Sequence, residues 1–178
     1  MSEMVFIRAN QVIGILLMLV TCQLSAQQGH SGHSAPEFSL PRLDNQQVLS
    51  LANLRGQVVY VDFWASWCPP CAESLPALQS LYEELQPQGF TVVAINLDET
   101  ALQAKRFVQP MTLTYPILFD ANKQTPQQYG ITGMPTAFLL DRHGNIHSRH
   151  TGFDPAKQTQ LKQQIQQLLQ ETSWQESF

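Results

Sequence analysis

The sequence has few cysteines and no basic segment that could follow a nucleic acid. Three of its 178 residues are cysteine, and its ten Lys and Arg residues are scattered among fourteen Asp and Glu residues. A small secreted domain held together by disulfides needs more cysteine pairs, and a nucleic-acid-binding protein carries clustered positive charge. The sequence therefore excludes a disulfide-stapled scaffold and predicts no nucleic-acid partner.

The apolar run near the N-terminus is too short for a membrane-spanning helix. It covers residues 12–20, about half of the roughly 20 residues that a bilayer requires. Arg8 precedes the run and small residues follow it up to Ala26, which is the order of a secretory signal peptide. We expect residues 1–26 to be such a signal and the mature protein to be periplasmic. Lipidation of Cys22, or retention of the segment as an anchor, would instead tether the protein to the membrane.

The rest of the chain predicts one α/β domain. Residues 27–36 are mainly Gly, Ser, His and Gln, which predicts a flexible linker, and residues 173–178 are expected to be a tail. Between them, residues 37–172 alternate β-type apolar runs with amphipathic helical segments. We expect a central mixed sheet flanked by helices, with parallel units first, an antiparallel hairpin last, an N-terminal hairpin and a central insertion. The expected strands are residues 58–64, 90–97, 115–119, 136–140 and 146–151. Four helices are expected: one directly after the cysteine pair, one over residues 100–108, one over residues 123–129, and a last one that begins at Asp154.

Cys68 and Cys71 stand where a buried strand is expected to pass into a helix. Free amides and the helix dipole at a helix N-terminus stabilise a thiolate. A dithiol of this spacing can attack a disulfide with one sulfur and release the product with the other. We therefore expect a redox-active disulfide, with Cys68 as the attacking thiolate and Cys71 as the resolving thiol. The sequence contains no second Cys-x-x-Cys to complete a zinc site, so we predict no metal and no other cofactor.

Asp62 interrupts the apolar run before the cysteines. A buried acid is costly unless it is neutral or paired, so burial should raise its pKa. A raised pKa suits a group that takes the proton of Cys71 near neutral pH. The structural alternative is an aspartate that reaches the edge of the sheet and water.

The stretch from Val61 to Cys71, which reads Val-Asp-Phe-Trp-Ala-Ser-Trp-Cys-Pro-Pro-Cys, resembles the active site of thioredoxins. A second stretch, Gly-Met-Pro-Thr at residues 133–136, resembles their cis-proline loop, and the insertion between residues 97 and 115 is similar to the TlpA/ResA branch. The resemblance implies a thioredoxin fold, a cis peptide bond before a proline that faces the cysteines, and disulfide exchange. The implied substrate-binding residues are Trp67, Pro69, Pro70, Met134 and Pro135. Trp64 and Trp67 could each pack in the core or form an apolar rim around the dithiol.

The resemblance also implies partners, with one departure. Branch members devoted to cytochrome c maturation often carry Glu three residues after the second cysteine, where this chain has Ser74, with Glu73 just before it. One residue rotates a helical side chain by about 100°, so a cytochrome-specific role does not follow. The implied partners are disulfide-containing exported proteins, with apocytochromes and copper-site proteins as candidates, and an upstream membrane thiol protein as electron donor.

Two other functions fit parts of the sequence. The dithiol could hold copper, a soft metal, with His30 and His33 assisting. A thiol peroxidase can share the fold, but such sites place Thr or Ser near a lone cysteine, which disfavours antioxidant activity here. His147 and His150 are three apart on an expected strand, so we expect them to be exposed on opposite faces and unable to share a metal ion.

The residues around Cys68 predict the direction of electron flow. The two intervening prolines offer no amide hydrogen to its sulfur, and Glu73 adds a nearby negative charge. We therefore expect a Cys68 pKa above about 5.5 and a reduction potential below about −180 mV. These values are typical of a reductant.

Overall fold

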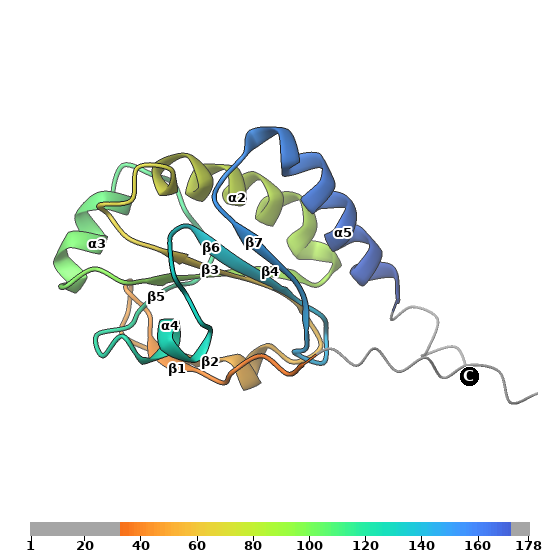
Figure 1. The fold of residues 1–178 in the computed structure, drawn as a ribbon, viewed down its shortest axis with the longest axis horizontal. Coiled ribbons are helices and arrows are strands. Elements are labelled where there is room, and N and C mark those ends of the chain that lie inside the picture. The colour runs from red at the N-terminus through yellow and green to blue at the C-terminus, as the bar shows by residue number, and fades with distance from the viewer. Residues whose placement is uncertain (1–32, 172–178) are drawn as a thin grey trace, which may run out of the picture. The chain divides into compact units, whose positions relative to one another are not determined.

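A computed structural model describes residues 33–171 of the chain (Figure 1). The expected signal peptide, Cys22, His30, most of the expected linker and the C-terminal tail lie outside the described residues. Within residues 33–171, no helix is long and apolar enough to cross a membrane.

A five-stranded sheet forms the centre of the domain, with the strand order β5-β4-β3-β6-β7 (Figure 1). The strands are β3 (Val58–Trp64), β4 (Phe90–Asn96), β5 (Ile117–Phe119), β6 (Thr136–Leu140) and β7 (Ile146–Thr151). β3 pairs in parallel with β4, and β4 with β5, whereas β6 and β7 add antiparallel pairs. The predicted mixed sheet, with its parallel units first and its hairpin last, is confirmed.

Helices and a small hairpin cover the two faces of this sheet (Figure 1). Apolar residues of α2 (Cys71–Leu85), α3 (Ala101–Val108) and α5 (Gln158–Glu171) pack into one hydrophobic core. The second core lies on the other side. It contains Tyr129, the C-cap of α4 (Gln124–Gln128), and residues of the 3-10 helix η1 (Leu51–Leu54), and residues of the hairpin of β1 (Ser39–Pro41) and β2 (Val48–Ser50) pack against it. β3 is buried along its whole length between these layers, as its apolar sequence predicts.

The N-terminal boundary of the domain differs from the predicted one. Residues 33–36 were expected in a flexible linker, but the amide of Ala35 donates to the carbonyl of Gly144 at 3.0 Å, and the amide of Ile146 donates to the carbonyl of His33 at 3.0 Å. Ala35 is buried. The polar composition of this segment could not reveal a pairing with a turn more than 100 residues away, because such pairing depends on backbone groups.

The ends of two elements also differ from the sequence pattern. β5 begins at Ile117 rather than at residue 115, because Pro116 has no amide hydrogen for a strand ladder. Before α5, a 3-10 turn η3 (Pro155–Lys157) forms, and the carboxylate of Asp154 accepts a hydrogen bond from the amide of Ala156 at 3.0 Å. The last helical segment therefore begins with a 3-10 turn capped by Asp154, and α5 follows it from Gln158.

The prediction for the histidines of the last hairpin needs correction. The register of β7 against β6 shifts between Leu139 and Leu140, which places His147 in a β-bulge. A bulge interrupts strict strand alternation, so the two side chains need not point to opposite faces. His147 and His150 are also half-buried rather than exposed.

Candidate active site

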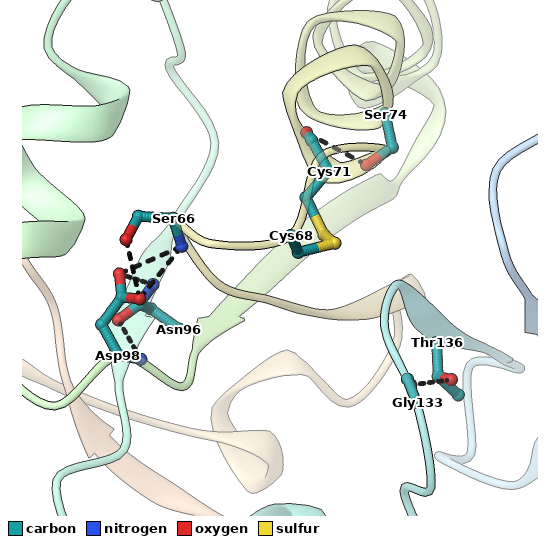
Figure 2. The surroundings of a disulfide bond; sticks show 8 residues. All are labelled: Ser66, Cys68, Cys71, Ser74, Asn96, Asp98, Gly133 and Thr136. Carbon is teal, nitrogen blue, oxygen red and sulfur yellow. Dashed lines mark hydrogen bonds between the residues drawn. A yellow bond between two sulfur atoms is a disulfide. The ribbon is translucent and has the colours of Figure 1, made fainter.

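The two predicted redox cysteines meet where β3 passes into α2 (Figure 2). Cys68 and Cys71 form a disulfide, with 5.4 Å between their Cα atoms, which is a normal separation for such a bond. Cys71 is the first residue of α2 and Pro70 is the N-cap. The amide of Cys71 donates to the carbonyl of Cys68 at 3.0 Å, so the turn between the cysteines is closed by the backbone.

The sulfur-bearing residues are buried, whereas their neighbours in sequence form an exposed rim. Cys68 is 4% exposed and Cys71 is fully buried. In the disulfide form, both cysteines are therefore buried at the start of the helix. Trp67 is 64% exposed, and Pro69 and Pro70 are also exposed. A partner that approaches the disulfide therefore meets this apolar rim first.

The two tryptophans take different positions. Trp64 is fully buried and its ring stacks on Phe107, with the ring centroids 5.6 Å apart. Trp67 projects to the surface beside the disulfide. Of the two roles that the sequence left open, Trp64 therefore takes the core position and Trp67 the rim position.

The loop before β6 has the predicted cis peptide bond, between Met134 and Pro135. Met134 is half-buried and packs against the hydrophobic core that contains both cysteines. The hydroxyl of Thr136 donates to the carbonyl of Gly133 at 2.6 Å, which holds the loop in a tight turn (Figure 2). The amide of Gly152 donates to the carbonyl of Pro135 at 2.9 Å and joins the loop to the end of β7.

Asp62 lies in the central strand, so the alternative of an aspartate at the edge of the sheet is wrong. It is 2% exposed, and its Oδ2 has no hydrogen-bond partner within residues 33–171. Desolvation by burial raises the pKa of Asp62 from 3.8 to about 8. Its strand neighbours Tyr60 and Trp64, two residues away on either side, belong to the same hydrophobic core as the cysteines. Strand alternation therefore places Asp62 on the face of β3 that α2 covers.

A cavity of about 260 Å³ lies beside Asp62. Its wall includes Ser74 of α2, Pro135 of the cis-proline loop and His150 of β7. Ser74 is buried and its hydroxyl donates to the carbonyl of Cys71 at 3.3 Å, whereas Glu73 is exposed. A hydroxyl, not a carboxylate, therefore faces the buried acid at this turn of the helix.

The sequence analysis missed a buried polar network that holds the segment before Cys68. The carboxylate of Asp98 accepts hydrogen bonds from the amide of Ser66 at 3.0 Å and from its hydroxyl at 2.9 Å (Figure 2). The side-chain amide of Asn96 donates to the other carboxylate oxygen at 2.9 Å. Asn96 and Asp98 are both fully buried. The available signal was an Asn-x-Asp sequence at the carboxyl end of a buried strand, where polar side chains need partners.

We expect Asp98→Asn to lower the free energy of unfolding by about 2–3 kcal/mol, because the new amide would face donors and leave buried groups unsatisfied. Chemical denaturation of the disulfide form measures this loss. Glu99→Gln is the control, since Glu99 is the exposed neighbour of Asp98 and its variant should unfold like the natural protein. Equal unfolding midpoints for Asp98→Asn and the natural protein would show that the network does not hold the segment.

Comparisons with known proteins agree with this geometry. Residues 30–165 match the model of the Redoxin family. The chain is 34% identical to the thiol-disulfide oxidoreductase ResA of Geobacillus thermodenitrificans over 139 residues, which cover 78% of this chain and 76% of that protein. It is 36% identical to the ResA of Halalkalibacterium halodurans over 122 residues, which cover 68% and 69%.

Solved structures give the same result. A protein of Chlorobium tepidum assigned as the thiol:disulfide interchange protein DsbE has a TM-score of 0.74 and 43% identity, over 78% of this chain and 96% of that one. StoA of Bacillus subtilis has a TM-score of 0.62 and 30% identity, over 72% and 96%. The chain therefore belongs to the Redoxin family, as a thioredoxin-fold, TlpA/ResA-type thiol-disulfide oxidoreductase.

Proposed function

We propose that this protein is an extracytoplasmic reductant of disulfides in exported proteins. The observation that carries the proposal is the Cys68–Cys71 disulfide at the start of α2, set inside an exposed apolar rim and accompanied by a buried acid. The signal-like N-terminal sequence supports export. The prolines between the cysteines support a reducing potential, because they offer no amide hydrogen to a thiolate.

In the proposed reaction, Cys68 is the nucleophile. Its thiolate attacks one sulfur of a substrate disulfide, the substrate S–S bond breaks, and the second substrate sulfur leaves with the electron pair and takes a proton. Cys71 then loses its proton and attacks the sulfur of Cys68. The bond between Cys68 and the substrate breaks, the substrate leaves as a dithiol, and the protein keeps the two-electron oxidised disulfide that the structure contains.

The rim and the cis-proline loop are the proposed substrate site. Trp67, Pro69 and Pro70 offer apolar contacts, and Met134 offers a flexible side chain that adapts to varied partners. The cis bond before Pro135 leaves the backbone of Met134 to pair with an extended substrate segment, as an added strand would. This mode recognises main chain rather than one sequence, which suits substrates that share only a disulfide.

Asp62 is the proposed proton partner of Cys71. With a pKa of about 8 in the disulfide form, its carboxyl group is mostly protonated at neutral pH. It can therefore give a proton to Cys71 when an electron donor opens the disulfide. When Cys71 instead resolves a mixed disulfide, the ionised form of Asp62 takes the proton of Cys71. The proposed donor is a membrane thiol protein, and exported apocytochromes and copper-site proteins remain candidate substrates.

Thiol trapping in intact cells tests the proposal. Cells are quenched with acid, free thiols are alkylated, and the mature protein is located by fractionation. We expect it outside the cytoplasm with Cys68 and Cys71 mainly as thiols, because a reductant is kept reduced by its donor. A cytoplasmic protein, or a mainly oxidised pair, would contradict the proposal. Stoichiometric copper in the purified protein, without any insulin-reducing activity, would favour the copper-handling alternative.

A further inference from the structure

Asp62 and His150 lie in one row across three strands of the sheet. Asp62 of β3 is the register partner of Ala137 in β6, and Ala137 is the register partner of His150 in β7. Register partners point to the same face, so all three side chains face the α2 side. Strands lie about 4.8 Å apart, which places the Cα atoms of the two outer residues about 10 Å from each other. The small side chain of Ala137 leaves the space between them open.

The cavity of about 260 Å³ occupies this space and is lined by all three residues. A cavity needs only about 10–15 Å³ and a few polar partners to hold a water molecule, so this one has room for several. Asp62 supplies a buried oxygen that lacks a hydrogen-bond partner within residues 33–171, and His150 supplies an imidazole. The outer wall consists of exposed residues such as Thr151 and Gly152, so the cavity leads toward the surface.

We propose that His150 relays protons between the Asp62 carboxyl group and the solvent through water in this cavity. The proposal rests on the proposed function, because it concerns the proton that Cys71 loses when it resolves a mixed disulfide. That proton passes to the Asp62 carboxylate, then through water to one nitrogen of the imidazole, while the imidazole releases a proton to the solvent. The same route runs backward when Asp62 regains a proton after giving one to Cys71.

The surroundings of His150 suit this role. The hydroxyl of Ser148 and the Nε2 atom of His150 are hydrogen-bonded at 2.9 Å, and the ring lies against Tyr60 with the centroids 5.8 Å apart. These contacts fix the ring on the wall of the cavity. Burial, and secondly the nearby His147, lower the pKa of His150. The imidazole is therefore neutral near pH 7, and a neutral imidazole can both accept and donate a proton.

The other titratable or charged groups around Asp62 are less suited to the relay. Burial raises the pKa of Tyr60 and of Tyr115 well above the working range. Lys157 and Asp154 form an ion pair at 4.0 Å on the exposed side of the cavity. The guanidinium of Arg149 lies over the ring of Phe138 and donates to a carbonyl on the loop before β6. Of the groups that line the cavity, His150 alone combines an imidazole, which can both accept and donate a proton, with a place on the wall in register with Asp62.

The test is a single-turnover measurement of resolution. Reduced protein is mixed with excess oxidised glutathione between pH 6.5 and 8.5, quenched with acid, alkylated and scored for the mixed and the intramolecular disulfide. We expect His150→Ala to resolve the mixed disulfide about tenfold more slowly near pH 7, less than the 10²–10⁴-fold loss of a direct acid-base group. Added imidazole should restore the rate in proportion to its concentration. His150→Gln is the second variant, in case the alanine variant folds poorly. It keeps a polar side chain but cannot titrate, so it should show the same slow resolution.

His143→Ala is the matched control, because His143 is an exposed histidine on the turn before β7. Its variant should resolve at the natural rate and should not respond to imidazole. An unchanged rate in both His150 variants, or a slow rate that imidazole does not move, would overturn the relay. Failure of the natural protein to form any mixed disulfide would instead overturn the proposed function, so the two failures are distinguishable.

Discussion

Replacing Cys68 by Ser should reduce disulfide reduction to the rate without protein, whereas Cys71→Ser should stop turnover but still capture substrates as mixed disulfides. Cys68 precedes α2 and is flanked by the exposed rim of Trp67 and Pro69, whereas Cys71 is the fully buried first residue of the helix. A substrate that docks on the rim therefore reaches the sulfur of Cys68 first. Insulin reduction measures turnover, and non-reducing electrophoresis after alkylation detects the captured species.

The double variant of both cysteines is the control for this experiment, because it has no thiol in the described domain that could capture a substrate. It should capture nothing under the same conditions. Capture by Cys68→Ser as efficient as capture by Cys71→Ser would mean that either sulfur can attack, and the assignment of roles would fail.

The second large effect is on stability, and it depends on pH. The pKa of Asp62 rises from 3.8 to about 8 on folding, so the folded protein holds this proton more tightly than the unfolded chain does. The contribution of Asp62 to stability is fully present below about pH 4 and is lost as the pH rises through 8. Every tenfold change in proton affinity corresponds to about 1.4 kcal/mol, so the whole loss is about 6 kcal/mol. Asp62→Asn removes this loss, and the variant should be more stable than the natural protein at pH 9 by several kcal/mol.

Chemical denaturation of the disulfide form at pH 5, 7 and 9 measures this effect. The advantage of Asp62→Asn should grow with pH, and the variant should resolve mixed disulfides slowly at pH 8, where the natural carboxylate accepts the proton of Cys71. Glu73→Gln is the control, because Glu73 is an exposed carboxylate near the cysteines and its variant should change stability by less than about 1 kcal/mol at every pH. If the difference in stability between Asp62→Asn and the natural protein were the same at pH 5 and at pH 9, the pKa of Asp62 would lie in the ordinary range.

Features of the fold and site that depend on local sequence could be predicted. The uniformly apolar run of β3 indicates a strand covered on both faces, and an acid inside that run indicates a buried carboxyl group with a raised pKa. The cis bond before Pro135 came from the resemblance to thioredoxins, because proline makes such a bond accessible without requiring it.

Features that depend on contacts between distant segments could not be predicted. Ser66 and Asp98 are 32 residues apart, and their hydrogen bonds exist only because β3 and β4 lie side by side. The almost complete burial of Cys68 likewise depends on how the core packs around the disulfide. The row from Asp62 to His150 needs the register of three strands, and no periodicity in the sequence gives that register.

The backbone around Cys68 supports the proposed reducing potential. The amide of Cys71 is the first one after the two prolines, and in the disulfide form it donates to the carbonyl of Cys68. The buried carboxylate of Asp98 holds the amide of Ser66, two residues before Cys68. Few free amides therefore remain near the sulfur to stabilise a thiolate at Cys68. A less stabilised reduced form corresponds to a more negative potential.

The reduction potential of the Cys68–Cys71 couple tests the central claim most directly. The protein is equilibrated with glutathione buffers of graded composition, quenched with acid and alkylated, and the fraction of dithiol is measured at each composition. We predict a potential below about −180 mV, on the thioredoxin side of the known range. A potential of about −120 mV, as in strongly oxidising relatives, would contradict the account and make this protein an oxidant of exported proteins.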